Sequence, residues 1–180
     1  QAVAGDCRMH TLVRLLHRTG ARISEVLALQ LSDLDLEHCK FQVVGKGNRQ
    51  RMCFYSEDVA MLLNKYLHYY RHPQCSALFT AENPLTGQVS HWSYRSVYQH
   101  WCNLTQPYRE LNGIRIHDLR HTFATERVGI MSLEELRALM GHQNIQTTLH
   151  YQKVTSQKAE AAAQRAFGAL LNQPLQTELE

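Results

Sequence analysis

The stretch of sequence that decides the fold runs from residue 116 to 141 and reads IHDLRHTFATERVGIMSLEELRALMG. The spacing of its apolar residues predicts a helix over 116–128, and Gly129 stops that helix. A serine and a glutamate three residues apart form a capping box at 132–135, which predicts the start of a second helix. Gly141 lies where a glycine commonly ends a helix. The stretch therefore predicts two consecutive helices with a defined turn between them.

The sequence on either side of this stretch carries helical and extended patterns. Expected helices cover residues 7–17, 23–29, 56–71, 94–101, 144–151 and, more weakly, the alanine-rich segment 155–171. Expected strands cover 41–44 and 51–55, joined by the turn 45–48 with Lys46 at its tip, and 77–79, which precedes a loop near 83–87. We therefore predict an α+β fold that is mainly helical, with a small antiparallel hairpin at one edge.

Composition sets broad limits on the function. The 180 residues, 44% of them hydrophobic, suit one compact domain that holds a rigid site. A formal net charge of +3 permits nucleic acid as a partner without requiring it. The five cysteines are odd in number and lack a C-x-x-C pair, which argues against disulfides or a cysteine zinc site and favours a reducing cytosol. No apolar run is long enough to span a membrane, so no membrane partner is expected.

The chain shows no internal domain boundary before its last segment. We expect one domain over residues 1–154, followed by a helix and a polar tail over 155–180. The last helix has a weak apolar stripe, which could dock on another surface. Because Gln1 is not an initiator methionine and a helical pattern begins almost at once, we expect a fragment of a longer chain.

Several residues are candidates for binding a phosphate. His117 and Arg120 are three positions apart and share one face at the start of a helix, where backbone N–H groups are unpaired. Arginine offers a planar fork that grips two phosphate oxygens, and Arg22, near another helix start, could supply a second fork. Taken singly, an arginine near a helix start is more often a solvated or ion-paired residue than a phosphate ligand.

Two alternative interpretations belong to the same region. His117 and His121 are four positions apart, like the histidine pair of a zinc hydrolase, but Asp118 stands where that motif has glutamate and no third ligand is evident. We therefore expect no metal. Tyr151 follows His142 by nine positions, and a buried, hydrogen-bonded structural tyrosine would fit that position as well as a reactive one.

Three sequence blocks, taken together, favour one family. They are TGARISE at 19–25, HDLRHTFAT at 117–125, and LMGH at 139–142 with Tyr151 following. In order and spacing they resemble the signature blocks of tyrosine recombinases and phage-type integrases. The resemblance extends from about residue 11 to 151, and the three blocks together are far more specific than any one of them.

The resemblance implies a role for each matching residue. Arg22 and Arg120 would bind the scissile phosphate, and Glu25 would support the site structurally. His117 would assist proton transfer and His142 would hydrogen-bond the phosphate.

The remaining assignments concern the nucleophile, the general acid and the DNA backbone. Tyr151 would be the nucleophile, and Lys46 at the hairpin tip would be the general acid. Lys40 is the rival for that role, although it precedes the turn. Further contacts to the DNA backbone are expected from Arg49, Arg51 and His121.

The function implied is a site-specific DNA recombinase that cleaves and religates strands through a 3′-phosphotyrosine, without metal, cofactor or ATP. Residues 1–154 would be its catalytic domain, the amino-terminal DNA-binding domain would be missing, and 155–180 would contact a neighbouring subunit. Double-stranded DNA would be the partner of a tetramer that is monomeric when free, in the cytoplasm of a bacterial-type cell and at the nucleoid when bound. Two alternatives remain: a catalytically silent, architectural DNA-binding relative, and a type IB topoisomerase-like enzyme that relaxes DNA.

Overall fold

The computed structural model describes residues 2–45, 47–142, 144–149, 151 and 164–165. The helices of this part of the chain are α1 (Cys7–Thr19), α2 (Ile23–Leu27), η1 (Leu31–Asp33), α3 (Glu57–Tyr69), α4 (Tyr94–Thr105), η2 (Arg109–Leu111), α5 (Asp118–Arg127), α6 (Leu133–Met140) and α7 (Ile145–Leu149). The strands are β1 (Leu34–Asp35), β2 (Lys40–Val44), β3 (Gln50–Phe54), β4 (Thr80–Glu82) and β5 (Val89–His91). The predicted fold class, mainly helical with small antiparallel sheets, is confirmed.

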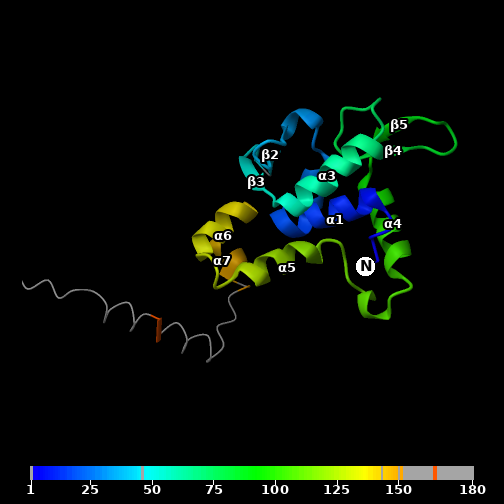
Figure 1. Ribbon diagram of the computed structural model, residues 1–180. Helices are drawn as coiled ribbons and strands as arrows, with labels where there is room; N and C mark the ends of the chain where they lie inside the picture. The colour runs from blue at the N-terminus through cyan, green and yellow to red at the C-terminus, as the bar shows by residue number, and fades with distance from the viewer. Residues whose placement is uncertain (1, 46, 143, 150, 152–163, 166–180) are drawn as a thin grey trace, which may run out of the picture.

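Helix α1 runs through the middle of the fold, with α3 packed along one side and α5 along another (Figure 1). It begins where the Asp6 side chain accepts a hydrogen bond from the backbone N–H of Met9 at 2.8 Å. It ends at Gly20, whose left-handed conformation (φ 62°) lets its own N–H bond back to the last turn. Apolar side chains at helical spacing, including Leu12 and Leu15, are fully buried and form the centre of the main core.

The predicted hairpin is present and gains a third strand. Strand β2 pairs antiparallel with β3, and the short β1 adds to the other edge of β2. Phe41 and Val43 alternate inward from β2 into the main core, which fixes the register of the sheet. Lys46, predicted at the tip of the hairpin, lies outside the described residues.

The predicted strand at 77–79 is wrong in its position. The paired strand β4 covers Thr80–Glu82 and forms a second hairpin with β5, around the predicted loop near 83–87. Residues 77–79 are buried at 0–2% exposure, and Ala77 makes only an isolated bridge to Gln30. The apolar run at 77–79 therefore reflects burial in the core, and the sheet pairing begins at Thr80, directly after it.

Helices α5 and α6 follow the predicted caps closely. The Ser132 hydroxyl accepts from the backbone N–H of Glu135, the Glu135 carboxylate accepts from the N–H of Ser132, and Gly141 ends α6 in the left-handed conformation. Apolar side chains of α5 and α6, among them Phe123 and Met140, form a second, smaller core cluster, against which Tyr151 packs. The nucleophile predicted from the sequence is therefore placed by this cluster rather than by the main core.

The last part of the chain is described only in small part. The helix predicted over 155–171 lies outside the described residues except for 164–165, so the division between 1–154 and 155–180 stays a prediction. Within the described helices, none combines the length and the apolar character that crossing a membrane requires.

Candidate functional site

The site is organised around one buried carboxylate, that of Glu25 in the first turn of α2. It accepts hydrogen bonds from the backbone N–H of Arg22 at 2.8 Å and from the Arg22 side chain at 2.9 Å. Both terminal nitrogens of Arg51, on β3, donate to it as well, at 2.8 and 2.7 Å. Burial alone would raise the pKa of Glu25, but these charged donors lower it to about 2. Glu25 is therefore an anion at neutral pH, and it fixes both arginines.

Arg51 ties three elements together from within the protein. Besides its paired bonds to Glu25, its Nε donates to the backbone carbonyl of Leu139 in α6 at 3.1 Å. Its side chain is 12% exposed. The side chain predicted to bind the DNA backbone thus holds β3, α2 and α6 in place, and its contact with DNA stays a prediction.

Arg120 is held by the ends of two other helices. It is 5% exposed, and its guanidinium donates to the carbonyl of Gly20, which closes α1, and to that of Met140, the last residue of α6, the latter at 2.6 Å. Carbonyls at helix C-termini lack intrahelical partners and carry partial negative charge, so a cation suits this position. The sequence-predicted phosphate ligand is thereby fixed at the junction of α1, α5 and α6.

The guanidinium groups crowd one another. Burial first, and then the positive charges of Arg22 and Arg51, lower the pKa of Arg120 to about 10. Within the described residues, Glu25 is the carboxylate that directly pairs with Arg22 and Arg51. The cluster therefore carries excess positive charge, as expected of a site that binds an anion.

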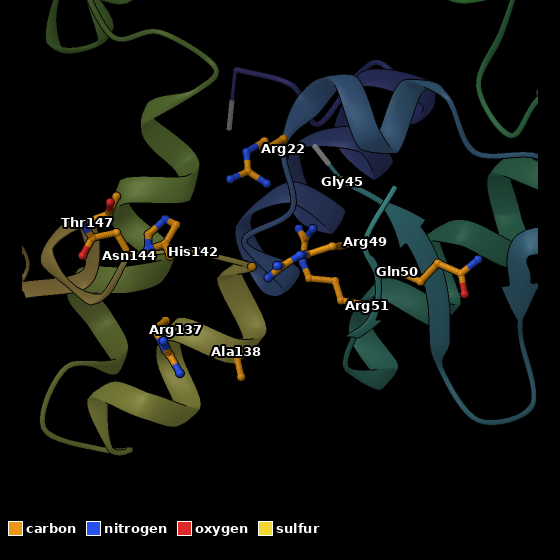
Figure 2. Close-up of a pocket in the computed structure, with 11 residues that line it drawn as sticks. Arg22, Gly45, Arg49, Gln50, Arg51, Arg137, Ala138, His142, Asn144 and Thr147 are labelled. Carbon is orange, nitrogen blue, oxygen red and sulfur yellow. The ribbon is translucent and has the colours of Figure 1, made fainter. Parts of the chain in front are cut away.

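Beside this cluster lies a cavity of about 510 Å³. Its walls include Arg22, Arg49, Arg51, Arg137, His142, Asn144 and Thr147 (Figure 2). Figure 2 shows His142, Asn144 and Thr147 on one side, facing Arg49 and Arg51 on the other. The cavity is thus lined by donors suited to phosphate oxygens.

His142 joins the cavity to the tyrosine. Its Nδ1 lies 2.9 Å from the hydroxyl of Thr148, which is fully buried in α7. Burial, and next the charge of Arg120, lower the pKa of His142 to about 4, so the ring is neutral at pH 7. On its other side the ring stacks against Tyr151, with centroids 6.5 Å apart and planes 9° from parallel.

The Tyr151 hydroxyl lies 2.9 Å from Nδ1 of His121. Burial raises the pKa of Tyr151, while the charge of Arg120 acts in the opposite direction. His117, one turn before His121, meets the His121 ring edge to face at 5.5 Å, and burial followed by the charge of His121 lowers the pKa of His117. The structure thus brings Tyr151, both histidines of α5 and His142 into one group.

The sequence analysis missed part of the cavity wall. Arg137, Asn144 and Thr147 line it, and none of them was a candidate residue. The sequence did carry a signal for Arg137. It precedes Gly141 by four positions, so it lies on the same helix face as the end of α6, next to the site. Among the described residues, no group of three or more histidine, cysteine or acidic side chains is placed to hold a metal ion.

Fold and site together describe a mainly helical protein with an arginine-lined cavity and a tyrosine close by. The model of the Phage integrase family matches residues 1–158. The chain belongs to this family.

Individual relatives agree with this assignment. The chain is 31% identical over 157 residues to the tyrosine recombinase XerC of Staphylococcus haemolyticus, covering 84% of this chain and 50% of the relative. It is 32% identical over 149 residues to XerC of Actinobacillus pleuropneumoniae, covering 81% and 47%. The chain thus spans about half the length of the curated relatives it matches.

Solved structures show the same fold. The XerA recombinase superposes with a TM-score of 0.74 at 24% identity, covering 92% of this chain and 60% of that one. The Tn1549 transposon integrase, in complex with transposon right end DNA, superposes with a TM-score of 0.75 at 22% identity, covering 92% and 61%.

Proposed function

We propose that this chain is the catalytic part of a site-specific recombinase, which cuts and rejoins DNA strands through a covalent 3′-phosphotyrosine at Tyr151. One observation above all supports the proposal. His142 lines a cavity beside a cluster of arginines with excess positive charge, and the ring of Tyr151 stacks on the ring of His142. A merely structural tyrosine would have no need of this charge.

The chemistry is an exchange of esters. The Tyr151 oxygen attacks the phosphorus and loses its proton, a bond from oxygen to phosphorus forms, and the bond from phosphorus to the 5′ oxygen breaks. The departing 5′ oxygen takes a proton, which the family resemblance assigns to Lys46. The 5′ hydroxyl of a partner strand then reverses the steps. Since one ester replaces another, the bond energy is kept and no ATP is consumed.

The arginines would stabilise the transition state. Arg22 and Arg120 approach the same region from α2 and α5, and their charges offset the negative charge that grows on the phosphoryl oxygens. His142 can donate to the phosphate through Nε2 when the Thr148 hydroxyl donates to Nδ1, because a neutral ring carries a single proton. Arg49 and Arg137 would hold neighbouring phosphates.

Double-stranded DNA is the proposed partner. Similar folds have been solved on DNA, among them XerH bound to its difH substrate and a lambda integrase dimer on a core site. We extend this partner to the present chain and propose a tetramer on the recombination site, formed from free monomers, with residues 155–180 contacting a neighbouring subunit. The half of the relatives that this chain does not cover would supply the other side of the DNA clamp.

The test uses nicked suicide duplexes, in which cleavage releases a short strand and traps the covalent intermediate. The duplexes carry a randomised sequence pool, because phosphate contacts do not reveal the target. The protein at its full natural length should form an adduct that resists denaturant, with the nucleotide on the peptide that contains Tyr151. Tyr151→Phe should abolish the adduct, while Tyr69→Phe, a change at an exposed tyrosine of α3, should leave it unchanged.

The possible outcomes separate the candidate functions. An adduct that persists in Tyr151→Phe would sink the assignment of the nucleophile. Sequence-independent relaxation of supercoiled DNA, with no strand exchange, would favour the topoisomerase-like alternative. A shift of the DNA in a native gel, with no covalent adduct from any member of the pool, would favour an architectural DNA-binding protein.

A further inference from the structure

The Tyr151 hydroxyl is paired with a histidine for which the sequence analysis predicts a different role. His117 was expected to assist proton transfer, and His121 was expected to contact the DNA backbone. Within the described residues, however, the hydroxyl hydrogen-bonds to Nδ1 of His121 at 2.9 Å, and the centroids of the two rings are 5.7 Å apart. That contact joins residues 30 positions apart in the chain.

We propose that His121 is a catalytic residue, the group that accepts the proton of Tyr151 as its oxygen attacks the phosphorus. The inference rests on the proposed function. In this step the O–H bond of the tyrosine breaks and an N–H bond forms at Nδ1 of His121. The tyrosine oxygen bonds to phosphorus, and the 5′ oxygen leaves with a proton from the general acid. The step requires the neutral tautomer of His121 with its proton on Nε2.

The placement of His121 on α5 favours this role. His117, Arg120 and His121 lie at spacings of three and four, so all three point from one face at the start of the helix. One helical turn thus presents the buried guanidinium and, beside it, an exposed imidazole that reaches the tyrosine. A shift of α5 would move phosphate ligand and proton acceptor together.

The tyrosine is held from two directions. His121 meets its hydroxyl, while His142 stacks on its ring face. The hydrogen bond to the hydroxyl and the stacked ring both restrict rotation of the Tyr151 side chain. The nucleophilic oxygen and its proton acceptor are therefore already within transfer distance before DNA arrives.

The surroundings of His117, His121 and His142 favour His121 as the proton acceptor. Among the described residues, the titratable groups close to His121 are His117, Asp118, His142 and Tyr151, and Arg120 directly precedes it in the chain. The pKa values of His117 and His142 are lowered, first by burial, so both rings are weaker bases than an ordinary histidine. A proton released by Tyr151 then passes to the histidine that already binds its hydroxyl.

The experiment measures single-turnover cleavage of the suicide duplexes against pH. In the unaltered protein the rate should depend less steeply on pH than in His121→Ala, because Tyr151 transfers its proton as its oxygen attacks. His121→Ala should lower the rate at pH 7 by about 10²–10⁴ and make it rise steeply with pH, because the tyrosine must then ionise by itself. Imidazole added to the buffer should restore part of the rate in His121→Ala only.

Two further variants separate proton transfer from positioning. His121→Asn keeps a hydrogen-bond acceptor near the place of Nδ1 but cannot take up a proton, so it should remain as slow as His121→Ala. His68→Ala, at a histidine on α3 far along the chain, should behave like the unaltered protein. Thermal unfolding of each variant checks that the fold is kept, as expected for an exposed residue.

The outcomes distinguish this inference from the proposed function. If the unaltered protein forms no adduct on Tyr151, the proposed function itself fails. If the adduct forms, and His121→Ala either keeps the full rate or loses rate with an unchanged pH profile and no rescue by imidazole, His121 is not the proton acceptor. Rescue of His121→Asn to full rate would reduce His121 to a positioning residue.

Discussion

His142 shows how its surroundings decide what a single side chain does. The ring lies between the arginine cluster and Tyr151, and its burial, together with the charge of Arg120, leaves a pKa of about 4. A histidine that stays neutral from pH 5 upward serves as a hydrogen-bond donor of fixed geometry and does not need to titrate. In this site the roles of the histidines therefore follow from position more than from residue type.

Lys46 provides the first prediction. Lys46→Ala should lose cleavage of ordinary DNA by at least about 10², the usual contribution of general acid catalysis, and regain it on a duplex with a 5′-thio leaving group, which needs no proton. Lys40→Ala is the matched control. Lys40 opposes Phe54 at the end of the hairpin away from the turn and pairs with Asp35 at 3.3 Å. Failure of the thio rescue would point to Lys40 as the general acid or to a purely electrostatic role for Lys46.

Gly20, at the end of α1, packs against Phe123 of α5. Its left-handed φ of 62° strains any other residue, and a Cβ there would overlap the ring of Phe123. Gly20→Ala should lower the free energy of unfolding by about 2–5 kcal/mol, from strain and overpacking together. Gly129→Ala, also at positive φ but with open space around it, should cost only about 1 kcal/mol. Urea titrations of both measure the difference, and equal losses would exclude the clash.

The ion pairs of Glu25 predict a pH dependence of stability. The folded-state pKa of about 2 lies below the ordinary value of 4.5, so the carboxylate stabilises the fold fully above pH 4.5. This contribution is lost as the pH falls from 4.5 towards 2, because the unfolded chain binds the proton first. Glu25→Gln should be less stable at pH 7 and show a flatter decline over that range. Glu134→Gln, at an exposed position of α6, should keep the original slope in urea unfolding at each pH.

The net charge of the protein is small, but its positive charge is concentrated around one cavity. The formal net charge is +3, yet several arginines converge on one cavity. Arg137→Ala should weaken binding to a short non-specific duplex and reduce the slope of log affinity against log salt by about 1. Lys65→Ala, on α3 and away from the cavity, removes the same charge and should leave the slope unchanged. Equal effects in a fluorescence titration would mean that the cavity does not face the DNA.

Much of the molecule could be predicted because its signals are local. The capping box at 132–135 and the glycines at 20 and 141 act within a few residues of themselves, and the helices they bound are present. The hairpin of β2 and β3 likewise follows from alternating residues around a glycine-bearing turn. The misplaced strand at 77–79 is the exception, because burial of three successive residues overrides the pattern.

The site was harder to predict where its contacts are distant in sequence. The identity of the candidate residues came from the family resemblance, whereas their pairing in space did not. Arg51 reaches Glu25 across 26 residues and Leu139 across 88, and His121 meets Tyr151 across 30. No local propensity encodes such pairs, so the inward role of Arg51 and the contact of His121 emerge only from the packed fold.

The placement of Arg120 has an evolutionary consequence. The same guanidinium that would hold the phosphate satisfies the terminal carbonyls of α1 and α6, so losing it leaves buried polar groups without partners. A descendant under no selection for catalysis could not discard this arginine freely, since the protein would fold less well. Arg120 should therefore persist in inactive copies of the gene after Tyr151 has drifted, and its presence alone is a poor marker of activity.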